Sequence, residues 1–321
     1  MFVRSAAALS ITLLASAATL FAGQSVLTVI GAGGEEEFRK QFEQWGSHWE
    51  KAAKTGEAEF LSIGKEPGGT NDIAQFQEAL AKLSKEGEPL WLVLLGHGTF
   101  DGKEAKFNLR GPDVSAAELA KWLQPFTRPL VIINTASSSA PFLNALSRSN
   151  RVIITATRSG NEENFARLGK YLSETIGSAA ADLDKDGQTS LLEAFVSAAR
   201  QTGDFYKSEG RLATEHALLD DNGDGLGTQA DWFRGVRAVK KPEKGGIDGL
   251  RAHQLHLVRN EQERKLAEEV RKRRDEIELA ISKLRESKAT VKEEEYYRQL
   301  EPLLVEMARL YESGNSDGQT D

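Results

Sequence analysis

Short apolar runs that alternate with amphipathic segments dominate the first half of this 321-residue chain. Each run is almost continuously hydrophobic, which is typical of a strand buried on both faces of a parallel sheet. The runs that we interpret as strands are 25–34, which enters a glycine turn, 58–64, 90–98, 130–135 and 151–157. Helical periodicity lies between and after them, at 35–54, 71–87, 115–126 and 163–176. The pattern predicts an α/β domain over residues 24–180, with a mostly parallel sheet and helices on both of its faces.

The charge balance excludes one broad class of function. The chain carries 41 basic and 48 acidic residues, so its formal charge is −7. A nucleic-acid-binding domain needs a basic stripe that replaces the counterions of the phosphate backbone, and we find none. We therefore expect no nucleic-acid partner.

The first 23 residues have the pattern of a secretory signal peptide. Arg4 precedes an Ala-rich apolar stretch that ends in small residues near Ala22 and Gly23. An uncleaved anchor is the alternative, because the stretch is near the length of a membrane span. Its Ala, Ser and Thr content makes it a weak span, so we expect cleavage, no stable membrane span and a secreted or periplasmic protein. The chain has no cysteine, so no disulfide can stabilise it after export.

The glycine turn after the first strand invites comparison with a dinucleotide-binding loop, in which a pyrophosphate sits on a helix N-terminus. Here Glu35, Glu36 and Glu37 occupy the first turn of the following helix. These carboxylates already complement the helix dipole and would repel a phosphate. A tight turn is the better interpretation.

Two strands end in residues that are suited to chemistry. The strand at 90–98 ends with His97 between two glycines, and the strand at 130–135 leads into Ser137, the first of three consecutive serines. Ligands of α/β sheets bind in the crevice outside the carboxyl ends of the strands. The backbone amides of Gly98 and Ser137 can point into that crevice as oxyanion donors. We expect His97 and Ser137 to lie side by side on neighbouring strands.

In these residues the chain resembles the caspase–legumain superfamily of cysteine peptidases. GHG at 96–98 is similar to the histidine–glycine step that ends one strand in that family, and NTASSS at 134–139 is similar to the alanine–cysteine step that ends the next. TATRSGNEENF at 155–165 is similar to a segment that helps to form the specificity pocket of legumain-type enzymes. The resemblance covers about residues 25–180 and implies a caspase/legumain-like domain.

The nucleophile departs from the pattern of that family. Ser137 occupies the cysteine position, and no cysteine elsewhere can replace it. An imidazole can ionise a thiol, whereas a serine hydroxyl needs a base during attack and normally a third group that orients the imidazole. The sequence identifies no carboxylate partner for His97. We favour a domain that has lost peptidase activity. The alternative is a serine-variant peptidase or hydrolase with a His97–Ser137 dyad and an oxyanion site at Gly98.

An acidic loop at 182–193, DLDKDGQTSLLE, resembles an EF-hand calcium loop. Carboxylates at alternate positions converge on one hard cation, and a glycine at position 6 permits the sharp turn. The candidate ligands at positions 1, 3, 5, 7, 9 and 12 are Asp182, Asp184, Asp186, the carbonyl of Gln188, Ser190 and Glu193. An exposed acidic turn without a metal is the alternative. We predict that this loop binds Ca²⁺.

A second candidate follows at 220–231, DDNGDGLGTQAD. Its candidate ligands are Asp220, Asn222, Asp224, the carbonyl of Leu226 and Asp231 at position 12. Two departures weaken the match. Position 8, which is usually apolar in paired loops, is Thr189 in the first loop and Gly227 in the second, and Asp at position 12 is shorter than the usual Glu.

The rest of the chain is charged and helical. We assign 181–239 to an EF-hand-like calcium-binding segment, 240–249 to a linker with few contacts, 250–314 to a helical hairpin and 315–321 to a disordered tail. A heptad-like stripe supports the hairpin and comprises Leu266, Val270, Ile277, Ile281 and Leu284. The hairpin packs on itself or on the main domain, or alternatively binds a partner. A protein or peptide partner would use the hairpin or the strand-end crevice.

Overall fold

The computed structural model of the chain describes residues 23–65 and 70–316. The signal-peptide prediction, apart from Gly23, and the part of the predicted tail after Ser316 lie outside these residues. Within the described ranges, no helix is long and apolar enough to cross a membrane.

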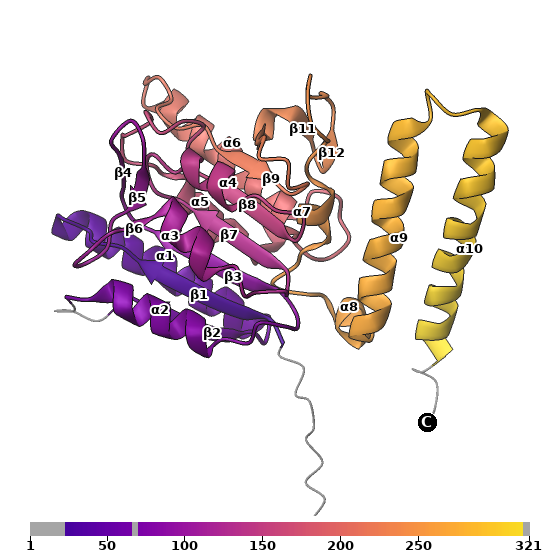
Figure 1. Cartoon of the computed structure of the whole chain (residues 1–321), viewed down its shortest axis with the longest axis horizontal. Helices are drawn as coiled ribbons and strands as arrows, with labels where there is room; N and C mark the ends of the chain where they lie inside the picture. Colours follow the sequence, from indigo (N-terminus) through magenta and orange to yellow (C-terminus); the bar gives the residue numbers. More distant parts are fainter. Residues whose placement is uncertain (1–22, 66–69, 317–321) are drawn as a thin grey trace, which may run out of the picture.

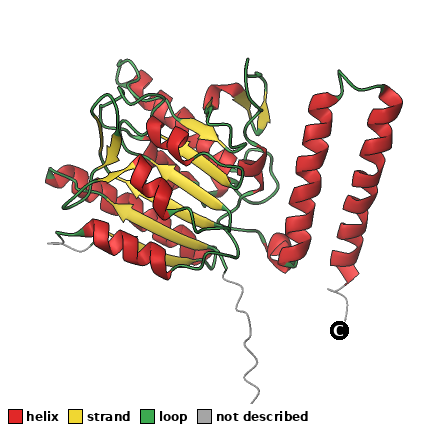
Figure 2. Ribbon diagram, viewed as in Figure 1, coloured by secondary structure: helices red, strands yellow, loops and turns green. Residues whose placement is uncertain are grey.

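A seven-stranded sheet forms the centre of the molecule, with strand order β10-β9-β8-β7-β3-β1-β2 (Figures 1 and 2). Five strands are mutually parallel: β1 (Ser25–Ile30), β2 (Glu59–Ile63), β3 (Leu90–Leu95), β7 (Leu130–Asn134) and β8 (Arg151–Thr155). At the far edge, β9 (Leu218–Asp220) runs antiparallel to β8, and β10 (Thr228–Gln229) runs antiparallel to β9. The predicted α/β class with a mostly parallel sheet is confirmed.

Helices cover both faces of this sheet. One layer contains α1 (Glu36–Thr55), α5 (Leu168–Thr175) and α6 (Leu191–Ser208), and the other contains α2 (Asp72–Lys82), α3 (Ala116–Trp122) and α4 (Ala140–Leu146). Side chains alternate along each strand, so Val93 packs in the first layer whereas Leu92 and Leu94 pack in the second. Burial on both faces explains why the strands lack polar alternation.

Two predicted helices are shorter in the structure than their periodicity suggested. The helix expected at 163–176 begins only at Leu168, because the buried Glu215 carboxylate accepts the amides of Arg167 and Leu168 and so caps α5. The helix expected at 71–87 ends at Lys82, where the ammonium of Lys85 caps the last carbonyls.

A small antiparallel sheet follows β3 directly and was not predicted. It contains β4 (Gly98–Phe100), β5 (Ala105–Phe107) and β6 (Val114–Ser115). Its strands have only two or three residues, which is too short for a periodic signal.

Residues 181–239 share the core of the sheet rather than standing apart from it. The segment begins as η1 (Ala179–Ala181) ends, and it contains α6, β9, β10, η2 (Ala230–Trp232), β11 (Phe233–Arg234) and β12 (Arg237–Ala238). Phe195 of α6 and Leu219 of β9 are fully buried in the same cluster as β7 and β8. The α/β core therefore includes this segment.

The C-terminal part forms α7 (Leu250–Gln254), α8 (Glu261–Lys265), α9 (Glu268–Ser287) and α10 (Glu293–Ser316). The last two make a hairpin beside the α/β body (Figure 1). Three residues of the expected stripe, Ile277, Ile281 and Leu284, are buried, whereas Leu266 and Val270 are not.

The segment expected to be a linker carries more contacts than its composition suggested. Asp248 is only 3% exposed, and Ala252 and Leu257 just after it are fully buried in the core cluster. The Gly- and Lys-rich stretch 240–247 is irregular, as expected, but it leads into a segment that belongs to the core.

Candidate functional site

His97 and Ser137 lie at the carboxyl ends of β3 and β7, which are adjacent parallel strands. Their predicted placement on neighbouring strands is thus as expected. The imidazole, however, turns toward the other neighbour, β1. Its Nε2 lies 3.3 Å from the carbonyl of Gly33, in the loop after β1, and its ring edges contact Phe38, Phe42 and Phe165.

The hydroxyl of Ser137 is fully engaged with the backbone of Gly98. It donates to the Gly98 carbonyl at 2.9 Å and accepts from the Gly98 amide at 3.2 Å. The approach is close enough that a Cβ on Gly98 would lie 2.3 Å from the carbonyl oxygen of Ser137. Glycine is therefore needed at this position for steric reasons.

This geometry differs from a catalytic dyad. Within the described residues, no hydrogen bond joins His97 to Ser137, and the Gly98 amide expected in an oxyanion site already donates to the serine hydroxyl. Burial among the phenylalanines lowers the pKa of His97, which keeps its imidazole neutral near pH 7. Ser138 adopts a left-handed backbone with φ of 53°, and its buried hydroxyl has no hydrogen-bond partner among the residues that the structure describes.

The first acidic loop brings three of its predicted ligands together. One carboxylate oxygen from each of Asp182, Asp184 and Glu193 lies within 4.8 Å of the other two. Calcium–oxygen distances are about 2.3–2.6 Å, so two oxygens on one ion can lie about 5 Å apart at most. Gly187 has φ of 88°, which gives the sharp turn that position 6 requires. These residues fit a bound calcium ion.

Glu193 closes the loop from the first turn of α6. Its Oε1 accepts from the amides of Leu183 and Asp184 at 2.6 and 3.2 Å, and its Oε2 accepts from the amide and hydroxyl of Ser190 at 2.8 Å. Ser190 is the N-cap of α6, and its hydroxyl in turn accepts the Glu193 amide. The helix start therefore holds the position-12 carboxylate in place.

Of the other predicted ligands of this loop, Asp186 is exposed and Gln188 is half-buried, whereas Ser190 is fully buried. The carboxylate of Asp186 accepts from the amide and the side chain of Gln188. The helix before the loop, α5, ends at Thr175, and η1 separates it from Asp182. The flanking geometry is thus helix, 3-10 turn, loop and helix rather than two long helices.

Residues far along the chain bind this loop and were missed by the sequence analysis. His253 Nε2 lies 2.9 Å from Oδ2 of Asp184, and the side chain of Asn260 donates to the carbonyl of Asp186 at 3.2 Å. The amide of Asn260 also donates to the side chain of Gln188. Nothing in the local sequence around these residues signals the contact, because about 70 residues separate them from the loop.

The second acidic loop has a different setting from the first. It connects β9 to β10, so it is the loop of a β-hairpin and no helix leads into it. Asp220 accepts the amides of Gly223 and Gly225, and Asp224 accepts the amide of Leu226. Asn222 accepts the amide of Asp224 through its side-chain oxygen.

Asp231, the residue predicted at position 12, lies away from this loop. It belongs to η2, its side chain is 64% exposed, and its carboxylate pairs with Lys240 at 2.6 Å. Two other carboxylates are buried here: Asp221, at position 2 of the loop, and Asp248, which accepts from the amide of Asp221. Burial raises the pKa of both, and the neighbouring charge of Asp221 raises that of Asp248 further.

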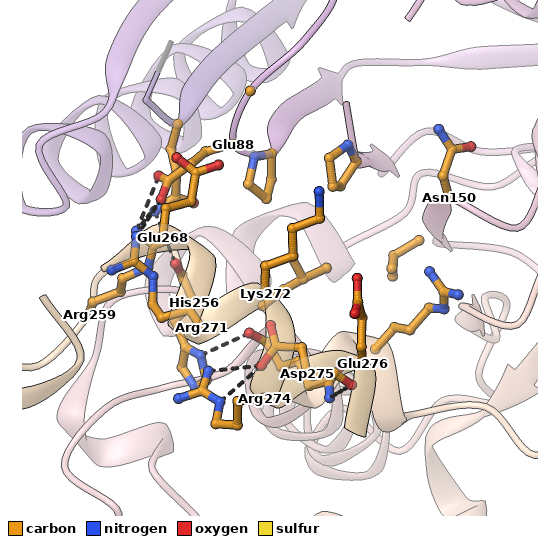
Figure 3. Close-up of a pocket in the computed structure, with 18 of the residues that line it drawn as sticks. Glu88, Asn150, His256, Arg259, Glu268, Arg271, Lys272, Arg274, Asp275 and Glu276 are labelled. Carbon is orange, nitrogen blue, oxygen red and sulfur yellow. Dashed lines mark hydrogen bonds and ion pairs between the residues drawn. The ribbon is translucent and has the colours of Figure 1, made fainter. Parts of the chain in front are cut away.

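A separate cavity of about 340 Å³ lies at the opposite end of the sheet, where β3 and β7 begin. Glu88 on its wall accepts from Arg259 and Arg271 at 2.9 and 2.7 Å, and Lys272 of α9 points into the cavity (Figure 3). These ion pairs connect α9 and the segment before α8 to the α/β body. The cavity lies between α9 of the helical hairpin and the α/β body, at the end of the sheet opposite to His97.

The chain matches no protein-family model and no curated protein sequence. Similar solved structures include caspases at low sequence identity. The Drosophila initiator caspase Dronc is 13% identical, with 63% of this chain and 80% of that chain covered and a TM-score of 0.44. Caspase-1 from Spodoptera frugiperda is 11% identical, with 62% and 86% covered and a TM-score of 0.41. Scores this low do not assign the chain to a family.

Proposed function

We propose that this chain is an exported calcium-binding protein that carries a caspase/legumain-like domain without cysteine peptidase activity. The convergence of Asp182, Asp184 and Glu193 carries the proposal, because their carboxylate oxygens are close enough to share one ion. The apolar segment at residues 1–23 supports export.

The donor set favours calcium over other metals. The ligands are carboxylate and carbonyl oxygens, which suit hard cations, and no cysteine exists to bind a softer metal. Magnesium demands near-ideal octahedral geometry at about 2.0–2.1 Å, whereas calcium accepts a wider and less regular set of oxygens. Three carboxylates that converge from an irregular loop and from the start of α6 meet the second requirement better.

Calorimetric titration with CaCl₂ and with MgCl₂ tests the proposal. We expect calcium binding at a Kd of about 0.1–1 mM, as in extracellular modules, and much weaker magnesium binding. Asp184→Ala removes the position-3 carboxylate and should abolish binding at the first loop. Asp204→Ala is the matched control, because Asp204 is an exposed residue of α6 outside the loop. A wild-type chain that binds no calcium would contradict the proposal.

The lack of peptidase activity is supported by the hydrogen bonds of Ser137. Its hydroxyl proton is directed at the Gly98 carbonyl, and the imidazole of His97 is bonded elsewhere. A serine needs a base that takes its proton during attack. The strand-end crevice would then serve to bind a protein or peptide partner, as would the hairpin.

A serine hydrolase that uses His97 and Ser137 is the second candidate, since the two residues do end adjacent strands. A fluorophosphonate probe distinguishes the two. We expect no labelling of Ser137, in native protein with or without calcium. Stoichiometric labelling that His97→Ala abolishes would establish the hydrolase instead.

A further inference from the structure

Asp248 repeats, at the second acidic loop, the contacts that Glu193 makes at the first. In the first loop, one oxygen of the closing carboxylate accepts the amides of positions 2 and 3, and the other accepts the hydroxyl of position 9. In the second loop, Asp248 Oδ1 accepts the amides of Asp221 and Asn222, which are positions 2 and 3, at 3.0 and 3.3 Å. Its Oδ2 accepts the hydroxyl of Thr228, which is position 9, at 2.6 Å.

The residue at position 12 by sequence does not have this role. Asp231 is paired with Lys240 and is largely exposed, whereas Asp248 is 3% exposed and faces the start of the loop. The β9–β10 hairpin explains why Asp248, and not Asp231, makes these contacts. The chain continues from Thr228 into β10 and η2 instead of a helix, so the next turn cannot bring its own carboxylate back over the loop.

We propose that Asp248 is the closing ligand of a second calcium site, which it completes together with Asp220, Asn222, Asp224 and the carbonyl of Leu226. The inference rests on the proposed calcium-binding function and adds to it a ligand that lies outside the contiguous loop. The site is thus assembled from two distant segments, and it forms only when the segment before α7 is folded onto the β9–β10 hairpin.

The burial of charge at this corner is an independent reason to expect a cation. Asp220, Asp221 and Asp248 are each 3% exposed or less, and within the described residues no salt bridge joins any of them to a basic side chain. The charge of Arg251 acts on Asp221, but no basic group in this part of the chain acts on the carboxyl of Asp248, which faces the charges of Asp221 and Asp220. Buried carboxylates without a compensating charge are costly. The carboxylate of Asp221 accepts a hydrogen bond from the amide of Ala252 in α7, and so it orders the segment that carries Asp248. A divalent cation bound by Asp220 and Asp248 would supply the missing positive charge.

A bound ion would also order the segment just before Asp248. The amide of Gly246 donates to Asp224 Oδ2 at 2.9 Å, so a ligand of the loop already touches this segment. Lys244 lies in the same stretch and is exposed, which makes it a site for trypsin. Calcium at the second loop should therefore slow cleavage after Lys244.

The test is calcium stoichiometry by calorimetry on the full chain, with Asp248→Asn and Asp231→Asn as a matched pair. Asn at 248 keeps an oxygen for the two amides, and its NH₂ can donate to Thr228, so the fold should survive. We expect two ions for the wild type, one for Asp248→Asn and two for Asp231→Asn. Calcium should protect Lys244 in the wild type and in Asp231→Asn but not in Asp248→Asn.

Two further variants keep the result decisive. Asp224→Ala removes an exposed ligand of the same site and should also lose one ion and the protection of Lys244, even if Asp248→Asn does not fold. Glu193→Gln should lose the other ion and keep the protection. One ion in the wild type that Glu193→Gln abolishes would overturn this inference and leave the proposed function standing. Two ions in Asp248→Asn would also overturn it, and no calcium binding at all would overturn both.

Discussion

Glu193 offers a sharp test, because its carboxylate has two separable roles. It caps the start of α6 through Ser190, and it closes the first acidic loop through the amides of Leu183 and Asp184. The substitution Glu193→Gln keeps the shape of the side chain and removes the charge. We expect a loss of stability without calcium and, separately, the loss of the stabilisation that calcium gives through this loop.

The magnitudes follow from the contacts. Gln has one acceptor oxygen, so in either orientation its NH₂ faces at least one backbone N–H that Glu193 now satisfies. A buried donor without a partner costs about 1–3 kcal/mol, which should be the loss in chelator. Calcium at 10 mM and a Kd of about 0.1–1 mM stabilises the native state by RT ln(1 + [L]/Kd), about 1.4–2.7 kcal/mol per site. The variant should lose one such increment.

The assay is urea unfolding in 10 mM CaCl₂ and in chelator, with Glu118→Gln as the matched control. Glu118 forms the same capping box with Ser115 at the start of α3, where no acidic loop precedes the helix. It should lose some stability in chelator and keep the full calcium increment. An unchanged calcium increment in Glu193→Gln would refute the assignment of Glu193 as a ligand. An equal loss of the calcium increment in Glu118→Gln would refute it as well.

Three further results are expected. Burial lowers the pKa of His97 in the folded protein, so as the pH falls below about 6.5 the unfolded chain binds a proton at this histidine first, and the contribution of His97 to the unfolding free energy falls until the folded pKa is passed. Buried carboxyls with a raised pKa, such as Asp248, act in the opposite direction, so the quantity to measure is the difference in unfolding free energy between the wild type and His97→Gln in chelator. A difference that does not change with pH would contradict the prediction. Gly98→Ala should cost about 1–3 kcal/mol in urea unfolding, because its Cβ meets backbone, and a neutral effect would argue against the close approach. Truncation after Asn260 should preserve cooperative thermal unfolding, whereas truncation after Lys241 should abolish it, because it removes the fully buried side chains of Ala252 and Leu257. Cooperative unfolding of both truncated chains would support the assignment of 240–249 as a linker.

The centre of the fold is predictable from the sequence because its signal is local. A strand that is buried on both faces is almost continuously apolar, as β3 is throughout and β7 is up to Asn134, and this pattern is readable in five or six consecutive residues. The two strands of the central sheet that were missed, β9 and β10, have three and two residues. Their place in the sheet comes from pairing with β8, which no local pattern encodes.

The candidate sites divide in the same way. The convergence of Asp182, Asp184 and Glu193 could be predicted, since these candidate ligands lie within twelve positions and the following helix holds Glu193. The placement of His97 on the end of β3 could also be predicted. Its orientation could not, because the direction of the imidazole depends on Phe38 and Phe42 of α1 and on Phe165, which are distant in sequence.

The two acidic loops are connected through one short segment of the chain. Asp248 at its start contacts the second loop, and His253 and Asn260 farther along contact the first. Between them, Leu257 is fully buried in the core. A cation at either loop would fix the same segment, and α8 and the hairpin follow directly from it. Because a bound ion stabilises only the conformation that forms its site, calcium at these loops would also stabilise the attachment of the hairpin to the α/β body.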